Sequence, residues 1–208
     1  MKYLFNINNL TYNVKSKNIL EKLTINIINT PVTIIRGPNG AGKTTFIKLL
    51  YGIYEPTHGS IKRCFEKNVS KTFLFQNPIY LNRSVFENLI HTLYCKNINR
   101  TDAKEIILSL CDNYNFHYLM NKEFKKLSGG EMQLASLLRA MVVNPDLIFY
   151  DEPTNNLDGN HFDMIISILD DLISEDKKLI TVSHDKRIFK NLQHKSIYLE
   201  DMRTIYYE

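Results

Sequence analysis

The sequence predicts an α/β fold with a mixed, mainly parallel sheet, an antiparallel β region at the N-terminus and an inserted α-helical region. A short apolar run at 32–35 leads into a glycine-rich loop and a helix. Two further apolar runs, at 147–150 and 179–182, end in polar side chains, and the middle third has helical spacing without a strand pattern. Continuous apolar runs are typical of parallel strands buried on both faces. We therefore expect one domain over residues 1–208.

The N-terminal region alternates apolar and polar residues over 3–10 and again over 23–28, which predicts two antiparallel strands. Tyr12 lies between them, 25 positions before the glycine-rich loop begins at Gly37. An aromatic ring here could stack on an adenine base. On its own, however, a tyrosine packed at the end of a strand is the better explanation.

The glycine-rich loop has the sequence GPNGAGKTT and stands between a predicted strand and a predicted helix. Glycines let the backbone curl round an anion, and the N–H groups of the loop and the helix start then point at phosphates. Lys43 supplies charge for the β- and γ-phosphates, and the Thr44 hydroxyl is a Mg²⁺ ligand. An ordinary glycine-rich turn would need neither flanking element. The residues expected to bind the nucleotide are Gly37, Pro38, Asn39, Gly40, Ala41, Gly42, Lys43, Thr44 and Thr45.

The middle of the chain begins with a predicted strand at 69–75, followed by Gln76. Ligands bind at the carboxyl ends of strands in open α/β sheets, although one glutamine alone carries little weight. Ser84 with Glu87 three positions later predicts a capping box at the start of a helix. Helices are expected at 84–94, 102–111 and 113–120. These segments predict a helical lobe inserted into the α/β core.

A second helix start with anion-binding character follows in the stretch LSGGE, from Leu127 to Glu131. Ser128, Gly129 and Gly130 place a cap and two small residues where free N–H groups begin a helix. The stretch has no lysine, so it is not a second phosphate loop of the first kind. It would serve as a partner surface presented to a phosphate.

The apolar run at 147–150 ends in two carboxylates, Asp151 and Glu152. A buried parallel strand would put both at its carboxyl tip, next to the phosphate loop. Asp151 suits the shell of Mg²⁺, and Glu152 suits the orientation or deprotonation of a water. Surface charges at a strand end are the common explanation of such a pair, but a poor one beside a phosphate loop.

The last third continues the α/β pattern. A turn is expected at 155–159, with Asp158 in it, then a helix at 159–173 and a buried strand that carries His184 at its tip. Most single histidines are structural or solvated, but His184 would end beside the site. A closing hairpin of edge strands is expected at 196–200 and 203–207.

Composition limits the classes of function. The formal net charge is +4 and the lysines are scattered, so no nucleic-acid partner is expected. The three cysteines are far apart without C-x-x-C spacing, which indicates reduced thiols in a cytosolic protein. No signal peptide or apolar window long enough for a bilayer is seen, so any work at a membrane would use a partner.

The order of these features resembles the ATP-binding-cassette (ABC) family of ATPases over essentially the full chain. LSGGE, followed by a strand ending in Asp-Glu-Pro and a strand ending in Ser-His-Asp, is highly specific for it. The resemblance implies a P-loop NTPase fold. Its RecA-like core would cover about 1–77 and 132–208, with a helical subdomain at about 78–131.

The resemblance also implies a mechanism in which two cassettes face each other head to tail. ATP on the phosphate loop of one would be covered by Ser128, Gly129, Gly130 and Glu131 of the other, with Asp158 at their interface. Tyr12 would stack on adenine. Mg²⁺ would be held by Thr44, Asp151 and Gln76. Catalysis is assigned to Glu152 as general base, His184 at the γ-phosphate, Lys43 and Gln76.

The leading functional hypothesis is the ATPase subunit of a membrane transporter. The resemblance implies integral membrane permease subunits, a second cassette, expected to be a copy of this chain, and for an importer a solute-binding protein. It places the chain at the cytoplasmic face of the bacterial inner membrane. The segment 75–88 resembles bacterial importers of small solutes, including tungstate- or molybdate-type oxyanion systems.

Two alternatives stay open at this point. A soluble ATPase switch that acts on ribosomes or nucleic acid would share the ATPase motifs, but a basic patch and a linker between two cassettes are not seen. A nucleotide-binding regulator without activity is disfavoured because Glu152 and His184 are both present.

Overall fold

The structure is a computed structural model that describes residues 2–66, 68–153, 157–185 and 193–208. Its strands are β1 (Tyr3–Val14), β2 (Lys17–Ile28), β3 (Val32–Arg36), β4 (His58–Arg63), β5 (Lys71–Leu74), β6 (Leu147–Asp151), β7 (Lys178–Val182), β8 (His194–Leu199) and β9 (Ile205–Tyr207). Its α-helices are α1 (Lys43–Tyr51), α2 (Val85–Tyr94), α3 (Arg100–Tyr114), α4 (His117–Met120), α5 (Gly129–Met141) and α6 (Gly159–Ser174), with a 3₁₀ turn η1 at Phe124–Lys126. The α/β class predicted from the sequence is confirmed.

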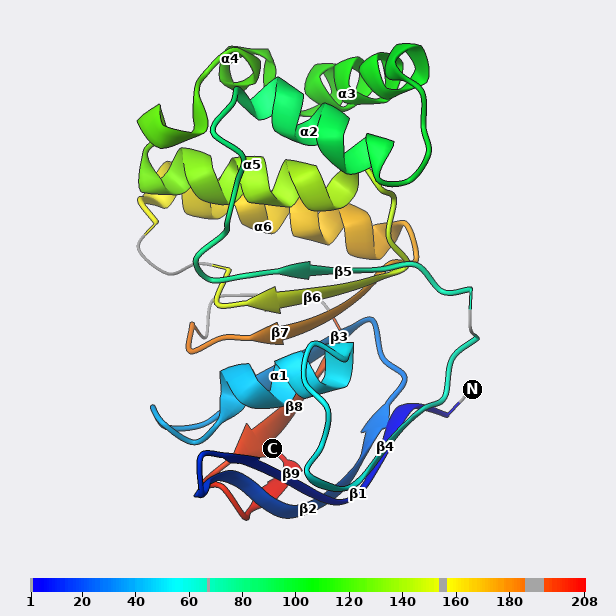
Figure 1. Ribbon diagram of the computed structural model, residues 1–208, viewed down its shortest axis with the longest axis vertical. Helices are drawn as coiled ribbons and strands as arrows, with labels where there is room; N and C mark the ends of the chain where they lie inside the picture. The colour runs from blue at the N-terminus through cyan, green and yellow to red at the C-terminus, as the bar shows by residue number, and fades with distance from the viewer. Residues whose placement is uncertain (1, 67, 154–156, 186–192) are drawn as a thin grey trace.

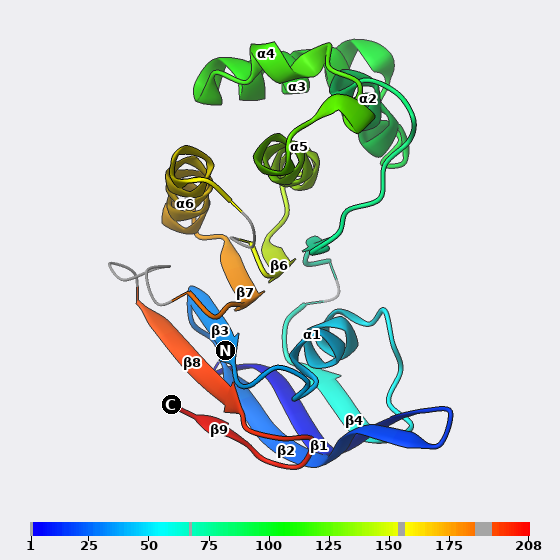
Figure 2. The same ribbon diagram turned by 90° about the vertical axis from the view of Figure 1, so that its left-hand side faces the viewer.

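The strands form two sheets, and the larger one carries the site. Its order is β5-β6-β7-β3-β8-β9, with parallel pairing from β5 to β8 and an antiparallel β9. The smaller antiparallel sheet has the order β2-β1-β4. Figure 2 shows α5 and α6 on one face of the larger sheet, and α1 between its other face and the smaller sheet. Both faces of the central strands are therefore covered.

Two hydrophobic cores explain why β3, β6 and β7 have nearly continuous apolar sequences. Successive side chains of a strand point to opposite faces. Ile34 and Tyr150 accordingly join the core beneath α5 and α6, while Ile35 and Phe149 join the core around α1. Each of these four side chains is fully buried. A strand buried on both faces is apolar at most positions, as the sequence predicted, and the buried Thr33 and Thr181 are exceptions in β3 and β7.

The N-terminal hairpin is longer than predicted. β1 and β2 pair antiparallel from Tyr3↔Ile28 to Val14↔Lys17, so Tyr12 lies within β1 rather than between two strands. Register shifts on both sides of Leu10 break the apolar alternation. A bulge moves the following residues to the opposite face of the sheet. The strand then continues without the regular alternation of apolar and polar residues from which a strand is predicted. The prediction that strands cover only 3–10 and 23–28 is therefore wrong at the inner ends.

The predicted C-terminal hairpin forms, but only one of its strands is at an edge. β8 pairs antiparallel with β9 and parallel with β3 on its other side. Ile197 and Leu199 are fully buried, as expected for an inner strand. The first and last thirds of the chain thus meet beside the phosphate loop.

The helical middle agrees with the prediction in type and differs in detail. The strand expected at 69–75 is only Lys71–Leu74, and α3 extends beyond 102–111 at both ends. α4 is shorter than the predicted 113–120, because Asn115 ends α3 in a left-handed conformation with φ 58°. At α2 the Ser84 side chain accepts from the Glu87 N–H, but the Glu87 carboxylate pairs with Arg100 at 2.9 Å. The predicted capping box is therefore half formed.

Figure 1 shows α2, α3 and α4 as an outer layer over α5, on the far side from the sheet. Their buried residues belong to the same hydrophobic core as the inner faces of α5 and α6. The division of the chain near residues 78 and 131 stays a prediction. Among the helices of the described residues, none is both long and apolar enough to cross a membrane.

Candidate nucleotide-binding site

The phosphate loop connects the end of β3 with the start of α1. A Cβ on Gly37 would lie 2.0 Å from the carbonyl oxygen of Leu199, so only glycine lets the loop pass β8. Gly42 is the N-cap of α1, with a left-handed φ of 95° and no side-chain hydrogen bond to the helix. The first N–H groups of α1 are thus not capped by a side chain, and an anion would find them there.

Lys43 is buried beneath this loop, with 6% of its surface exposed. Its Nζ donates to the carbonyl oxygens of Gly37 and Pro38 at 2.9 and 2.8 Å. Burial lowers the pKa of Lys43, and the carboxylates of Glu152 and Asp151 oppose the shift. The ammonium group is therefore held by its own loop at the point where phosphate charge is expected.

Thr44 and Asp151 meet across the gap between α1 and β6. The Thr44 hydroxyl donates to Oδ1 of Asp151 at 3.1 Å, and Asp151 is 2% exposed. Burial raises the pKa of Asp151, against the effects of the Thr44 hydrogen bond and of Lys48. A hydroxyl and a carboxylate are the hard oxygen ligands that Mg²⁺ prefers, completed by phosphate oxygens and water. These residues fit that ion, while no group of three or more His, Cys, Asp or Glu among the described residues could hold a metal by itself.

Glu152 faces the phosphate loop across a cavity of about 410 Å³. The cavity is lined by Ile19, Asn39, Gly40, Gly42, Lys43, Thr44, Thr45 and Glu152. Glu152 has a positive φ of 56°, and its N–H donates to the carbonyl oxygen of Val182 at 3.0 Å. The Gln76 amide donates to Oε2 of Glu152 at 2.7 Å. In this structure Gln76 therefore contacts the predicted base rather than the Thr44–Asp151 pair.

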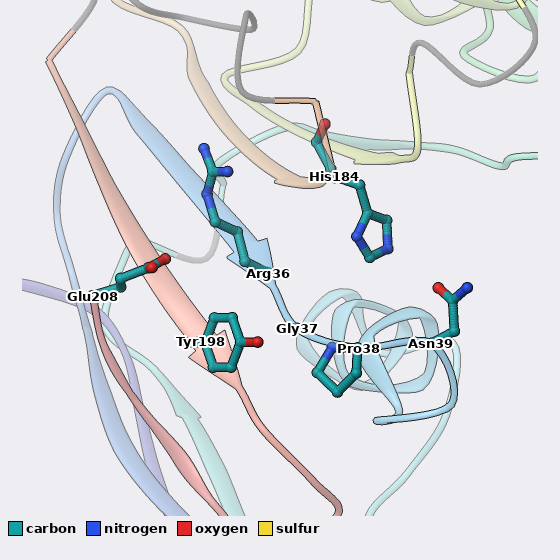
Figure 3. A pocket seen from close by; sticks show the side chains of 8 residues that line it. Arg36, Gly37, Pro38, Asn39, His184, Tyr198 and Glu208 are labelled. Atoms are coloured by element: carbon teal, nitrogen blue, oxygen red, sulfur yellow. The ribbon is translucent and has the colours of Figure 1, made fainter.

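His184 lies on the other side of the phosphate loop, just after β7. It lines a second cavity of about 540 Å³, together with Arg36, Gly37, Pro38, Asn39, Ser183, Tyr198 and Glu208. Figure 3 shows the imidazole pointing from the end of β7 toward the loop between Gly37 and Asn39. The predicted position of His184 beside the loop is confirmed. Arg36 and Tyr198 were not predicted, because each looks like an ordinary residue of a strand.

Tyr12 packs against another aromatic ring. Its ring is stacked on Tyr54 with centroids 5.3 Å apart and an interplanar angle of 12°, so one face is covered by the protein. The packing interpretation therefore holds for that face. Ile19, on the second strand of the same hairpin, lines the phosphate cavity instead. The sequence did not predict Ile19 at the cavity, because a single isoleucine in a strand is not a recognisable motif.

The LSGGE stretch forms the start of α5 and carries a complete capping box. The Ser128 Oγ accepts from the Glu131 N–H at 3.3 Å, and the Glu131 carboxylate accepts from the Ser128 N–H at 3.0 Å. The Lys122 ammonium lowers the pKa of Glu131 through a hydrogen bond. Ser128 and Gly129 are exposed, Gly130 is buried, and none of the three lines either cavity. Within one chain, this helix start is separate from the phosphate loop.

Asp158 is the N-cap of α6, and its Oδ1 accepts from the His161 N–H at 3.0 Å. This hydrogen bond lowers the pKa of Asp158, and the His161 ring pairs with the same carboxylate at 2.7 Å. The His161 ring also lies under Gly130, where it leaves no room for a side chain. Of the turn predicted at 155–159, residues 155 and 156 lie outside the described residues.

A phosphate loop, a hydroxyl–carboxylate pair and a glutamate at the ends of parallel strands define the P-loop class of nucleotide-binding proteins. The family model of ABC transporters matches residues 20–155, more than half of the chain. The lipoprotein-releasing system ATP-binding protein LolD of Buchnera aphidicola is 30% identical over 189 residues, which cover 84% of this chain and 83% of the relative. The chain therefore belongs to the ABC transporter family as an ATP-binding subunit, and it is an ATPase.

Other relatives agree with this assignment. The tungstate uptake system ATP-binding protein TupC of Peptoclostridium acidaminophilum is 28% identical over 203 residues, 95% of each chain. Among solved structures, a dimeric bacterial ABC transporter cassette superposes with a TM-score of 0.83 at 24% identity, over 98% of this chain and 97% of that one. CbiO1 of Clostridium perfringens gives a TM-score of 0.82 at 22% identity, over 100% of this chain and 88% of that one. These two structures support the fold.

Proposed function

We propose that two copies of this chain close head to tail on ATP and use its hydrolysis to drive transport of a solute across a membrane. The observation that carries the proposal is the separation of two anion-binding helix ends. The α1 end opens into the cavity with Lys43, whereas Ser128 and Gly129 at the α5 end are exposed and line neither cavity. A second chain with the same features would cover each phosphate loop with the exposed helix end of the other.

Within this proposal each residue has a chemical role. The uncapped N–H groups of α1 and the Lys43 ammonium bind the phosphates. Thr44 and Asp151 hold Mg²⁺, which would neutralise phosphate charge when bound. Glu152 accepts a proton from the attacking water and is oriented for this by Gln76, while His184 contacts the γ-phosphate. Positioning and charge neutralisation are the main contributions to phosphoryl transfer, and the base adds to them.

Asp158 and Tyr12 take the two remaining roles. Asp158 is exposed at the start of α6 beside the α5 helix end, which suits a place in the interface between copies. Tyr12 would stack on adenine through the ring face that Tyr54 does not cover.

The partners follow from the transporter assignment. We propose integral membrane permease subunits, a solute-binding protein for uptake, and a location at the cytoplasmic face of the membrane. The cargo is proposed to be a small solute such as an oxyanion, supported by the segment 75–88 and by the match to TupC over 95% of both chains. Relatives at similar identity are named for zinc import and lipoprotein release, and identification of the permease distinguishes these cargoes.

The test is affinity capture of tagged Glu152→Gln protein from detergent-solubilised membranes in the presence of ATP and Mg²⁺. This variant should bind ATP and dimerise with turnover reduced about 10²- to 10⁴-fold, because the base is lost and the shape is kept. A polytopic membrane protein recovered in stoichiometric amount, and absent when Lys43→Ala protein is used, would support the transporter. Recovery of ribosomal proteins or nucleic acid without a membrane protein would favour a soluble switch. Unchanged turnover would remove Glu152 from its role.

A further inference from the structure

A buried glutamine on α5 has no role in the proposal so far. Gln133 follows Gly130 by three positions and has 8% of its surface exposed. Its Oε1 accepts from the Tyr150 hydroxyl at 3.1 Å, and its Nε2 donates to the carbonyl oxygen of Gln76 at 3.1 Å. One amide thus joins α5 to the ends of two strands, β5 and β6.

Together with the backbone from Tyr150 to Glu152, these contacts close a ring that includes the predicted base. The Gln76 side chain donates to Glu152 at 2.7 Å, and Glu152 stands two residues after Tyr150 on the same chain. Starting at Gln133, the ring passes through Gln76 and Glu152 and returns through Tyr150. Gln133 and Tyr150 are buried, so either would be costly to leave without its partner, whereas Gln76 and Glu152 are half-buried.

The strand side of the ring is rigid. Tyr150 is fully buried, and burial strongly raises its pKa, so the hydroxyl keeps its proton for Gln133. Its carbonyl oxygen also accepts from the Thr181 hydroxyl at 2.9 Å, which ties β6 to β7. The side of Gln76 is less constrained, since β5 ends at Leu74 and Gln76 stands in the segment that follows. The hydrogen bond from Gln133 therefore fixes the backbone of Gln76 to the core.

We propose that Gln133 is a positioning residue for ATP hydrolysis. It holds the Gln76 side chain in hydrogen-bond contact with Glu152 and links both residues to the helix that begins at Ser128. A shift of α5 on engagement of a phosphate at its start would move the Gln76 carbonyl and change the orientation of Glu152. The inference rests on the proposed role of Glu152. A glutamine that only satisfied buried polar atoms would stabilise the fold without acting through Gln76.

The test is a double-mutant cycle on steady-state ATP hydrolysis by the full chain. Gln133→Met keeps the length of the side chain and removes both hydrogen bonds. We expect kcat to fall by about tenfold or more with KM for ATP changed less than about threefold, because the phosphate loop is untouched. In the Gln76→Ala background the same substitution should lower kcat by less than about twofold, since the connection to Glu152 is already cut.

Leu138→Ala is the matched control, because Leu138 is fully buried on the same helix and outside the ring. It should lower the melting temperature and leave kcat near that of the wild type at temperatures well below melting. If Gln133→Met does not fold, Gln133→Glu replaces it, since its carboxylate still accepts from Tyr150 but cannot donate to Gln76.

The outcomes separate this inference from the function on which it rests. A Gln133 variant with normal kcat, or an equal loss of kcat with and without the Gln76 side chain, would overturn the positioning role. Full turnover by Glu152→Gln would instead overturn the role of the base.

Discussion

The two glycines that begin α5 form a matched pair for substitution, because their surroundings differ. A Cβ on Gly130 would lie 2.5 Å from Cγ of His161, whereas a Cβ on Gly129 would meet nothing within 4 Å. Neither is among the glycines with positive φ, so alanine suits both backbones. Gly130→Ala should therefore destabilise the fold, and Gly129→Ala should not.

The size of the difference follows from two effects. Alanine in place of glycine within a helix is worth about 0.5–1 kcal/mol, which applies to both positions. Overpacking typically costs about 1–3 kcal/mol, and it applies only to Gly130. The His161 ring cannot retreat freely, because its Nδ1 lies 2.7 Å from a carboxylate oxygen of Asp158. We expect Gly130→Ala to melt on the order of 3–9 °C below Gly129→Ala in a chain of this size.

Thermal unfolding of the nucleotide-free variants measures this difference. The His161→Ala substitution makes room beside Gly130. When both glycine substitutions are repeated in this background, their two melting temperatures should converge. Equal melting temperatures in the wild-type background would refute the tight contact with His161. ATP turnover adds a second readout: Gly129→Ala should lose activity without losing stability, since its exposed backbone is proposed to approach the phosphate bound by a partner copy.

Two further predictions concern the charged residues of the site. Lys43→Ala should weaken ATP binding by at least about tenfold, or about 1.4 kcal/mol, in a fluorescence titration, while Lys104→Ala on the exposed face of α3 should bind normally. Asp151→Asn should raise the melting temperature of the nucleotide-free protein at neutral pH. Burial raises the pKa of Asp151, so the folded protein holds this proton to higher pH than the unfolded chain, and stability is lost as pH rises above the ordinary value of 3.8. Between about pH 4 and pH 7, the melting temperature of the wild type should fall more than that of the variant. An equal or smaller fall would contradict this.

The parallel strands could be predicted because burial on both faces requires a largely apolar sequence. A strand covered on both faces is apolar at most positions, as at Ile34 and Ile35, and the charged residues then fall at its tip. The pairing of β8 with β3 could not be predicted in the same way. It joins segments about 160 positions apart, and β8 alone has the sequence of an ordinary hairpin strand.

Local patterns at helix starts show the same limit. Ser84 with Glu87 and Ser128 with Glu131 have the same spacing, yet only the second pair forms both bonds of a capping box. The Glu87 carboxylate instead pairs with Arg100, thirteen residues later. A capping pattern thus predicts the helix start reliably, while a residue distant in the sequence decides where the second carboxylate points.

The residues that the sequence did not reveal act through contacts between distant elements. Ile19 lines the phosphate cavity, Gln133 joins two strand ends, and His161 packs under Gly130. Each looks like an ordinary core or surface residue, because its role depends on what the fold places beside it. The phosphate loop is recognisable from the sequence because nine consecutive residues carry its function.

Two side chains that would meet Mg²⁺ or the attacking water already have a protein partner: Thr44 has Asp151, and Glu152 has Gln76. Binding must exchange these hydrogen bonds for bonds to phosphate, to Mg²⁺ or to water, and such exchanges contribute little net free energy. The N–H groups at the start of α1 are different, because no side chain caps them. The affinity for phosphate should therefore depend most on the backbone of the loop and α1, together with the charge of Lys43. The side chains of Thr44 and Glu152, and Glu152 above all, would determine the rate of hydrolysis more than the affinity.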